Sequence, residues 1–175
     1  MDTIQQNKAL FIFEGISFII LGILAIAVPA FFTLGFELFI GWLFIFTSFV
    51  QAYRLIKLHR ILPGFTAALI TTIIYFIAGL LLLAYPVQGI ITLTVLLIIY
   101  FLLEGIAKIG WGFELRPLKG SGWLITSGII SLIMAAIIIA GWPTTAFWVL
   151  GLLIGINMLF FGSSLIALAW SAPKV

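Results

Sequence analysis

Residues 61–103 read ILPGFTAALITTIIYFIAGLLLLAYPVQGIITLTVLLIIYFLL and contain no Asp, Glu, Lys or Arg. A helix needs about 20 apolar residues to cross the bilayer core, so this stretch is long enough for two crossings. Pro86 divides the stretch near its middle, and proline interrupts helices because it has no N–H to donate. We therefore predict one membrane helix on each side of the Tyr85-Pro86 step.

The rest of the chain has the same character. Of its 175 residues, 65% are hydrophobic and 7% are charged, whereas soluble domains carry about 25% charged residues. This composition excludes a soluble domain and also a disordered chain, and the spans lack the period-two alternation of a β-barrel. We predict a single all-α integral membrane domain, residues 1–175, with six transmembrane helices at about 9–28, 31–53, 65–85, 88–111, 122–142 and 144–170.

The composition also excludes several kinds of chemistry. The chain has no Cys and one His, which removes disulfides, thiolate sites, cysteine nucleophiles and multi-histidine metal centres. No glycine-rich loop is followed by the Lys-Ser/Thr pair of a phosphate-binding motif. We therefore expect no enzyme activity, no catalytic residues, no cofactor and no metal.

The basic residues predict the orientation of the helices. All of them fall on one side of the predicted topology: Lys8, Arg54, Lys57, Arg60, Lys108, Arg116, Lys119 and Lys174. Because basic residues accumulate on the cytoplasmic side, both termini are predicted to be cytoplasmic. The net charge of +3 then reflects topology and not nucleic-acid binding. The expected partner is the lipid bilayer, and a protein partner or a homo-oligomer remains open.

An internal repeat accompanies the three prolines of the predicted turns. Pro29, Pro86 and Pro143 are evenly spaced along the chain, and the interval between successive prolines is the repeat length. A repeat of this length indicates a unit of two helices, and a unit of two spans keeps one orientation in every copy. We predict three parallel-repeated helical hairpins, at about 9–53, 65–111 and 122–170.

Small residues recur at two-turn spacing in three of these helices, as the pairs Gly15 and Gly22, Gly41 and Ser48, and Gly155 and Gly162. Gly79 and Gly105 follow Gly22 and Ser48 by one repeat length. Small residues on one face allow helix backbones to approach closely in lipid. The face either lines a pore or ligand groove or packs tightly within a hairpin, and we favour packing.

These features together resemble the HdeD family of acid-resistance membrane proteins. The residues that carry the resemblance are Gly15-x6-Gly22-x6-Pro29, Gly141-Trp142-Pro143, the stretch from Gly151 to Asn157, and Gly162. The resemblance spans essentially the whole chain. It implies six spans in a bacterial inner membrane and a part in surviving acid, and it implies no catalytic residues.

Glu37 is the most notable polar residue within the predicted spans. It lies about 9 Å inside the outer end of its helix, on the face of Gly41 and Ser48, and no basic residue lies at that depth. Ionisable groups at such depths are costly and are candidates for function. Glu37 is either a proton-binding or solute-contacting site, or a neutral carboxyl bonded to Thr94, Tyr75 or a backbone carbonyl.

Three other polar residues are candidates for structural roles. Glu104 lies one turn before Lys108 in the favourable order for an ion pair, and we expect Glu14 to pair with Lys8 near the same interface. Asn157, in the middle of the last helix, is expected to hydrogen-bond across helices.

Two functions follow from these residues. The first is a non-enzymatic role in acid-stress resistance, in a multi-pass inner-membrane protein of the HdeD type. The second is a small channel or transporter for protons or a small uncharged solute that uses Glu37.

Overall fold

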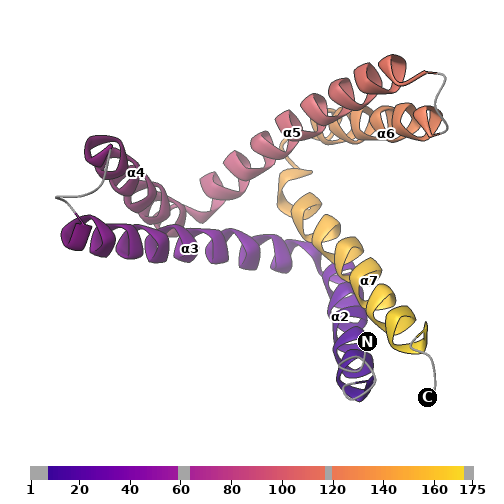
Figure 1. The fold of residues 1–175 in the computed structure, drawn as a ribbon, viewed down its shortest axis with the longest axis horizontal. Helices are drawn as coiled ribbons and strands as arrows, with labels where there is room; N and C mark the ends of the chain where they lie inside the picture. Colours follow the sequence, from indigo (N-terminus) through magenta and orange to yellow (C-terminus); the bar gives the residue numbers. More distant parts are fainter. Residues whose placement is uncertain (1–7, 59–63, 117–119, 172–175) are drawn as a thin grey trace. The chain divides into compact units, whose positions relative to one another are not determined.

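The computed structural model describes residues 8–58, 64–116 and 120–171. The helices of this part are α2 (Lys8–Ala27), α3 (Pro29–Leu58), α4 (Phe65–Ala84), α5 (Pro86–Glu114), α6 (Ser121–Ala140) and α7 (Ala146–Ser171), drawn in Figure 1. Each of these six described helices is long and apolar enough to cross a membrane, and the described residues contain no strand. The all-α, six-helix membrane fold is confirmed.

The prolines act on the helix ends in two ways. Pro29 and Pro86 are the first residues of α3 and α5, where a missing N–H costs nothing because the first turn has no internal acceptor for it. Pro143 instead lies in the turn between α6 and α7. There the hydroxyl of Thr145 donates to the carbonyl oxygen of Ile138 at 2.8 Å, which closes the end of α6.

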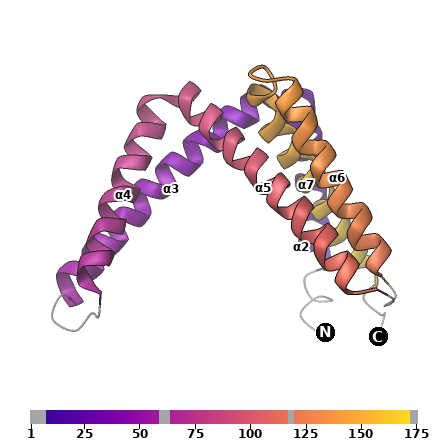
Figure 2. The same cartoon turned by 90° about the horizontal axis from the view of Figure 1, so that it is seen from above.

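The chain forms two compact units. The terminal unit is Met1–Thr33 with Phe147–Val175, and the central unit is Leu34–Ala146. In the terminal unit α2 contacts α7 through glycines. In the central unit α3 lies along α4 and α5 lies along α6, while α4 and α5 meet at their connecting turn (Figure 2).

Glycine contacts define these helix pairs. In each pair a glycine faces the carbonyl oxygen of a glycine on the other helix: Gly15 faces Gly162 and Gly22 faces Gly155 in α2·α7, Gly79 faces Gly41 in α3·α4, and Gly105 faces Gly128 in α5·α6. A Cβ added to the first glycine of any of these couples would lie 2.8 or 2.9 Å from that oxygen, so only glycine allows this approach. Ser48, which is also buried, donates to the carbonyl oxygen of Ile45 at 2.7 Å.

The paired helices belong to different repeats. Gly41 lies in the second helix of the first repeat and Gly79 in the first helix of the second, and the same relation joins Gly105 to Gly128. These glycines therefore do not pack within hairpins, and the expectation that they do is wrong. The face with small residues was correctly identified, but its periodicity does not say which helix lies against it.

Most of the apolar surface of the helices is exposed. Large side chains such as Phe13, Phe46, Ile70 and Phe160 are more than half exposed, which suits a protein whose solvent is lipid. In the central unit the fully buried side chains lie beside the proline turns, and they include Glu37, Thr94, Ile138 and Ala146.

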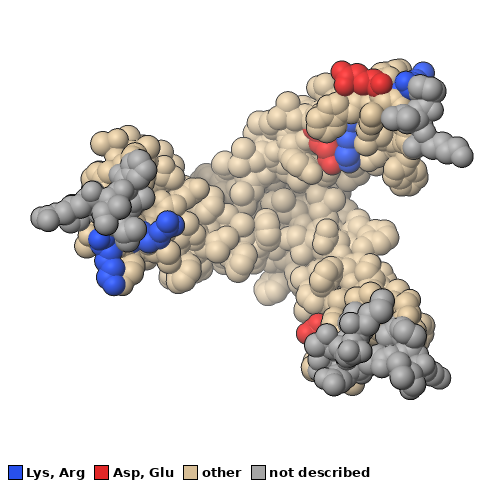
Figure 3. Space-filling model, in the orientation of Figure 1, with Lys and Arg blue, Asp and Glu red and all other residues tan. Residues whose placement is uncertain are grey.

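Basic side chains of the central unit lie near the helix ends that are remote from the proline turns. Arg54 and Lys57 are in the last turns of α3, and Lys108 and Arg116 are near the end of α5. Figure 3 shows Lys and Arg side chains near the ends of the two helix pairs, with a broad uncharged surface between these ends. Three further basic residues lie outside the described part: Arg60, Lys119 and Lys174.

Candidate functional site

Glu37 is completely buried in the central unit. It lies about two turns from the start of α3, its side chain is 0% exposed, and neither carboxylate oxygen has a hydrogen-bond partner among the described residues. A buried polar group without a partner is costly, because it loses its interaction with water and gains none in return. Glu37 is therefore the residue whose presence packing alone does not explain.

The carboxyl group lies against Gly89 in the first turn of α5. A Cβ added to Gly89 would overlap Oε1 of Glu37, so only a glycine at this position leaves room for the carboxyl. Gly89 was not identified from the sequence. The residues one repeat length away on either side are Phe32 and Ala146, so the repeat gives no signal for a glycine here.

The hydrogen bonds expected for Glu37 are not found in the described part of the chain. The hydroxyl of Thr94 donates to the carbonyl oxygen of Ile90 at 2.9 Å and lies 3.5 Å from that of Ala146. The ring of Tyr75 packs on the ring of Phe44, with centroids 5.5 Å apart. Neither carboxyl oxygen of Glu37 has a hydrogen-bond partner among the described residues, so the expected bond to Thr94, Tyr75 or a backbone carbonyl is not formed there.

A cavity of about 570 Å³ lies in the same unit, beside Gly89. It is lined by Phe44 of α3, by Ala78, Leu81, Leu82 and Tyr85 of α4 and its following turn, and by Gln88, Gly89, Thr92, Leu93 and Leu96 of α5. Glu37 is not part of this lining. Gly89 thus contacts the carboxyl group of Glu37 and also forms part of the cavity wall.

The repeat places different residues at the positions equivalent to Glu37. Thr94 follows it by one repeat length and Gly151 by two, and both are buried. In the terminal unit the N–H of Gly151 donates to the hydroxyl of Thr33 at 2.9 Å, and a Cβ on Gly151 would overlap the backbone of Pro29. The equivalent position of the three repeats is therefore occupied by Glu37, Thr94 and Gly151. Of these three, only Glu37 lacks a hydrogen bond from its polar atoms among the described residues.

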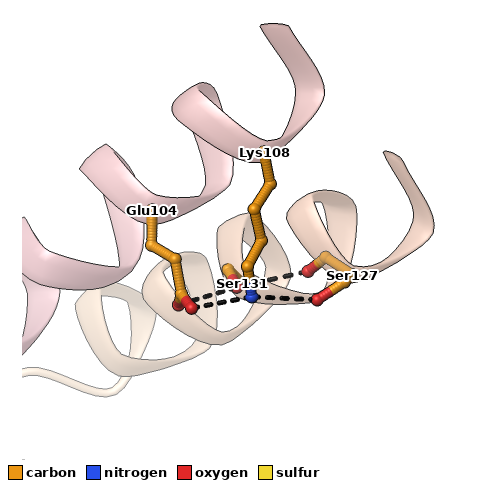
Figure 4. Close-up of polar contacts among 4 residues, drawn as sticks. All are labelled: Glu104, Lys108, Ser127 and Ser131. Atoms are coloured by element: carbon orange, nitrogen blue, oxygen red, sulfur yellow. Dashed lines mark hydrogen bonds and ion pairs between the residues drawn. The ribbon is translucent and has the colours of Figure 1, made fainter. Parts of the chain in front are cut away.

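Glu104 lies in a very different environment, between α5 and α6 (Figure 4). Its carboxylate forms an ion pair of 2.7 Å with Lys108, as the spacing of four residues predicts. Ser131 of α6 donates to the same carboxylate at 3.1 Å, and Lys108 donates to the hydroxyl of Ser127 at 3.0 Å. The two serines, which we had not identified, connect the charges across the helix pair.

Glu14 and Asn157 do not have the partners expected for them. Glu14 is exposed, and the described part of the chain contains no ion pair between it and Lys8, because six residues place the two side chains on different faces of α2. Asn157 is also exposed, beside a shallow groove that contains Phe18 and Phe161, and it forms no hydrogen bond with a described side chain.

The described residues contain no group of three His, Asp or Glu side chains that would hold a metal ion. What the arrangement offers chemically is one buried carboxyl with no counter-charge and one carboxylate held in a polar network.

The comparisons with known proteins concern the repeat. The family model "Short repeat of unknown function (DUF308)" matches residues 13–84 and again residues 70–140. The starts of the two matches differ by one repeat length, which is the spacing of the three prolines. No curated protein and no solved structure matches the chain.

Proposed function

The chain belongs to the family of short repeats known as DUF308, and on this premise we propose that it contributes to acid-stress tolerance without catalysing a reaction. HdeD, the acid-resistance protein that the sequence resembles, belongs to the same family. The observation that carries the proposal is the double family match, because the offset between its two parts coincides with the repeat on which the resemblance rests.

The packing of Glu37 supports a structural role over a transport role. A carboxyl that relays protons or contacts a solute needs access to a hydrated path. Glu37 is fully buried, it lies against the backbone of Gly89, and it is absent from the lining of the nearby cavity. We propose that the protein acts as a stable helical element of the envelope membrane.

We further propose that the protein resides in a bacterial inner membrane with both termini in the cytoplasm. The support is the placement of charge. Arg54, Lys57, Lys108 and Arg116 gather near the helix ends remote from the proline turns, and none lies at the turns. Basic residues near the ends of spans favour the cytoplasmic side.

Survival of acid tests the main proposal. Cells that lack the gene are expected to survive an acid challenge less well than cells that carry it, and a plasmid copy is expected to restore survival. Glu37→Gln keeps the shape of the side chain and is expected to restore survival as well, with Glu14→Gln as the matched control at an exposed acid. Equal survival with and without the gene would contradict an acid-stress role.

A second candidate function is the movement of protons or a small uncharged solute through Glu37. It is favoured by one observation, the unpartnered carboxyl next to a wall of the cavity. Purified protein in liposomes with an internal pH dye and an external acid step tests it. Proton flux that Glu37→Gln abolishes and Glu14→Gln leaves intact would establish this function, and flux equal to that of empty liposomes would reject it for protons.

A further inference from the structure

The cavity between α4 and α5 has the features of a ligand site. Its volume of about 570 Å³ lies within the range of small-molecule pockets, which are mostly apolar with a few polar groups. None of its lining residues is Asp, Glu, Lys or Arg. The ligand that fits this lining has an apolar body and is not held by charge.

The polar side chains of the lining, Tyr85, Gln88 and Thr92, lie at the Tyr85-Pro86 turn or within two helical turns of it. Gln88, Thr92 and Leu96 follow one another at intervals of four residues on α5, so they line one stripe about 12 Å long. The stripe begins with an amide beside the Tyr85-Pro86 turn and ends with an apolar side chain deeper in the span. The cavity therefore changes from polar to apolar in the direction that leads from the end of the helices into the membrane.

The repeat alone does not create this cavity. The residues that correspond to Ala78, Leu81 and Gln88 one repeat later are Ala135, Ile138 and Thr145. All three are buried, and the exposed fraction is 1% for Ile138 but 54% for Leu81. The second and third repeats thus differ in how exposed their residues are at these equivalent positions.

We propose that this cavity binds one acyl chain of a bilayer glycerophospholipid, with the ester region of the lipid at Gln88 and Tyr85. The amide of Gln88 and the hydroxyl of Tyr85 are hydrogen-bond donors, and ester carbonyl oxygens are acceptors. Leu81, Leu93 and Leu96 then contact the chain below them. Because the lining carries no charge, the site does not select among lipid headgroups.

Photolabelling in lipid nanodiscs tests the proposal. The probe is phosphatidylcholine with a diazirine on one acyl chain, and a second preparation uses the corresponding phosphatidylglycerol. Label is expected to concentrate in residues 78–96, compared with the exposed face of α6, and to a similar extent with both lipids. Leu81→Trp places an indole in the cavity and is expected to lower this label about fivefold.

Leu80→Trp is the matched control for that variant. Leu80 neighbours Leu81 on α4 and is 52% exposed, but it does not line the cavity. Labelling of residues 78–96 in Leu80→Trp is expected to stay at the wild-type level. Label that both variants lower equally, or that neither lowers, would overturn the proposal, as would labelling of residues 78–96 by only one of the two lipids.

A second pair of variants on α5 keeps the proposal testable if Leu81→Trp does not fold. Leu96→Trp fills the deep end of the cavity, and Leu103→Trp adds the same side chain at an exposed position outside it. The wild-type protein gives an independent result, because label spread evenly along α4, α5 and α6 contradicts a specific site without any substitution.

Discussion

The two helix pairs of the central unit share one kind of backbone contact and differ in the polar side chains that lie between their helices. In α3·α4, Gly79 lies against the carbonyl of Gly41, and in α5·α6, Gly105 lies against that of Gly128. The polar side chains at related positions differ. Thr72 donates to the uncharged Gln51 at 3.1 Å in the first pair, and Lys108, which follows Gln51 by one repeat length, forms an ion pair in the second.

Glu104 and Glu37 also have opposite surroundings. Glu104 is 23% exposed, has a cation at 2.7 Å and accepts a hydrogen bond from Ser131. Glu37 is fully buried and has no such partner among the described residues. The repeat thus fixes how the helices approach one another, while individual substitutions within it decide whether a polar group stabilises the fold or costs it stability.

The largest expected effect comes from Gly89→Ala. The added methyl group overlaps Oε1 of Glu37, and overpacking of this kind costs about 1–3 kcal/mol of the free energy of unfolding. Denaturant titration of the purified protein in micelles measures it. Gly110→Ala is the control on the same helix, because no atom lies within 4 Å of its added Cβ, and it is expected to be neutral or slightly stabilising. Equal stability of the two variants would show that Glu37 does not pack on Gly89.

Replacement of Glu37 by Met is expected to raise the free energy of unfolding by about 1–2 kcal/mol. Methionine is similar in size and removes a polar group that has no partner in the described residues. Glu37→Gln, which keeps a buried polar group, is expected to change stability less. A loss of stability in Glu37→Met that exceeds the change in Glu37→Gln would reveal a hydrogen-bond partner for the carboxyl.

Replacement of Glu104 by Gln is expected to have the opposite sign. It leaves Lys108 without its counter-charge and lowers the free energy of unfolding by about 1 kcal/mol, since the pair is partly exposed. A double-mutant cycle with Lys108→Met isolates the contribution of the pair. Glu14→Gln, at an exposed acid, is the control, and a loss as large as that of Glu104→Gln would remove the contrast between the sites.

The smallest expected effect is that of Ser131→Ala. It removes one hydrogen bond between helices, and such bonds contribute about 0.6 kcal/mol in membrane proteins. Ser17 is the matched control, because it lies two repeats earlier and its one hydrogen bond among the described residues is to the carbonyl of Phe13 in its own helix. Thermal unfolding should separate the two alanine variants, and identical midpoints would contradict a role for Ser131 in joining α5 to α6.

Much of the fold follows from local features of the sequence. Apolar length gives the six spans, the prolines give the turns, and the spacing of Glu104 and Lys108 gives their ion pair, since both residues lie on one helix. Contacts between helices do not follow in this way. Gly89 meets Glu37 from the first turn of α5, the second helix of the next repeat. The glycines present the same face to whichever helix is adjacent, so the spacing of residues identifies neither the partner of Glu37 nor the partners of the glycines.

The pairing of helices from neighbouring repeats is the claim on which the comparison rests, and cysteine cross-linking tests it most directly. The chain has no Cys, so two introduced cysteines react without background. Phe49 of α3 and Phe76 of α4 have ring centroids 6.1 Å apart, and a short bismaleimide is expected to link Phe49→Cys to Phe76→Cys. Phe76→Cys with Val95→Cys of α5 tests packing within the second repeat and is expected to stay unlinked. Linkage of the second pair and not the first would contradict the account.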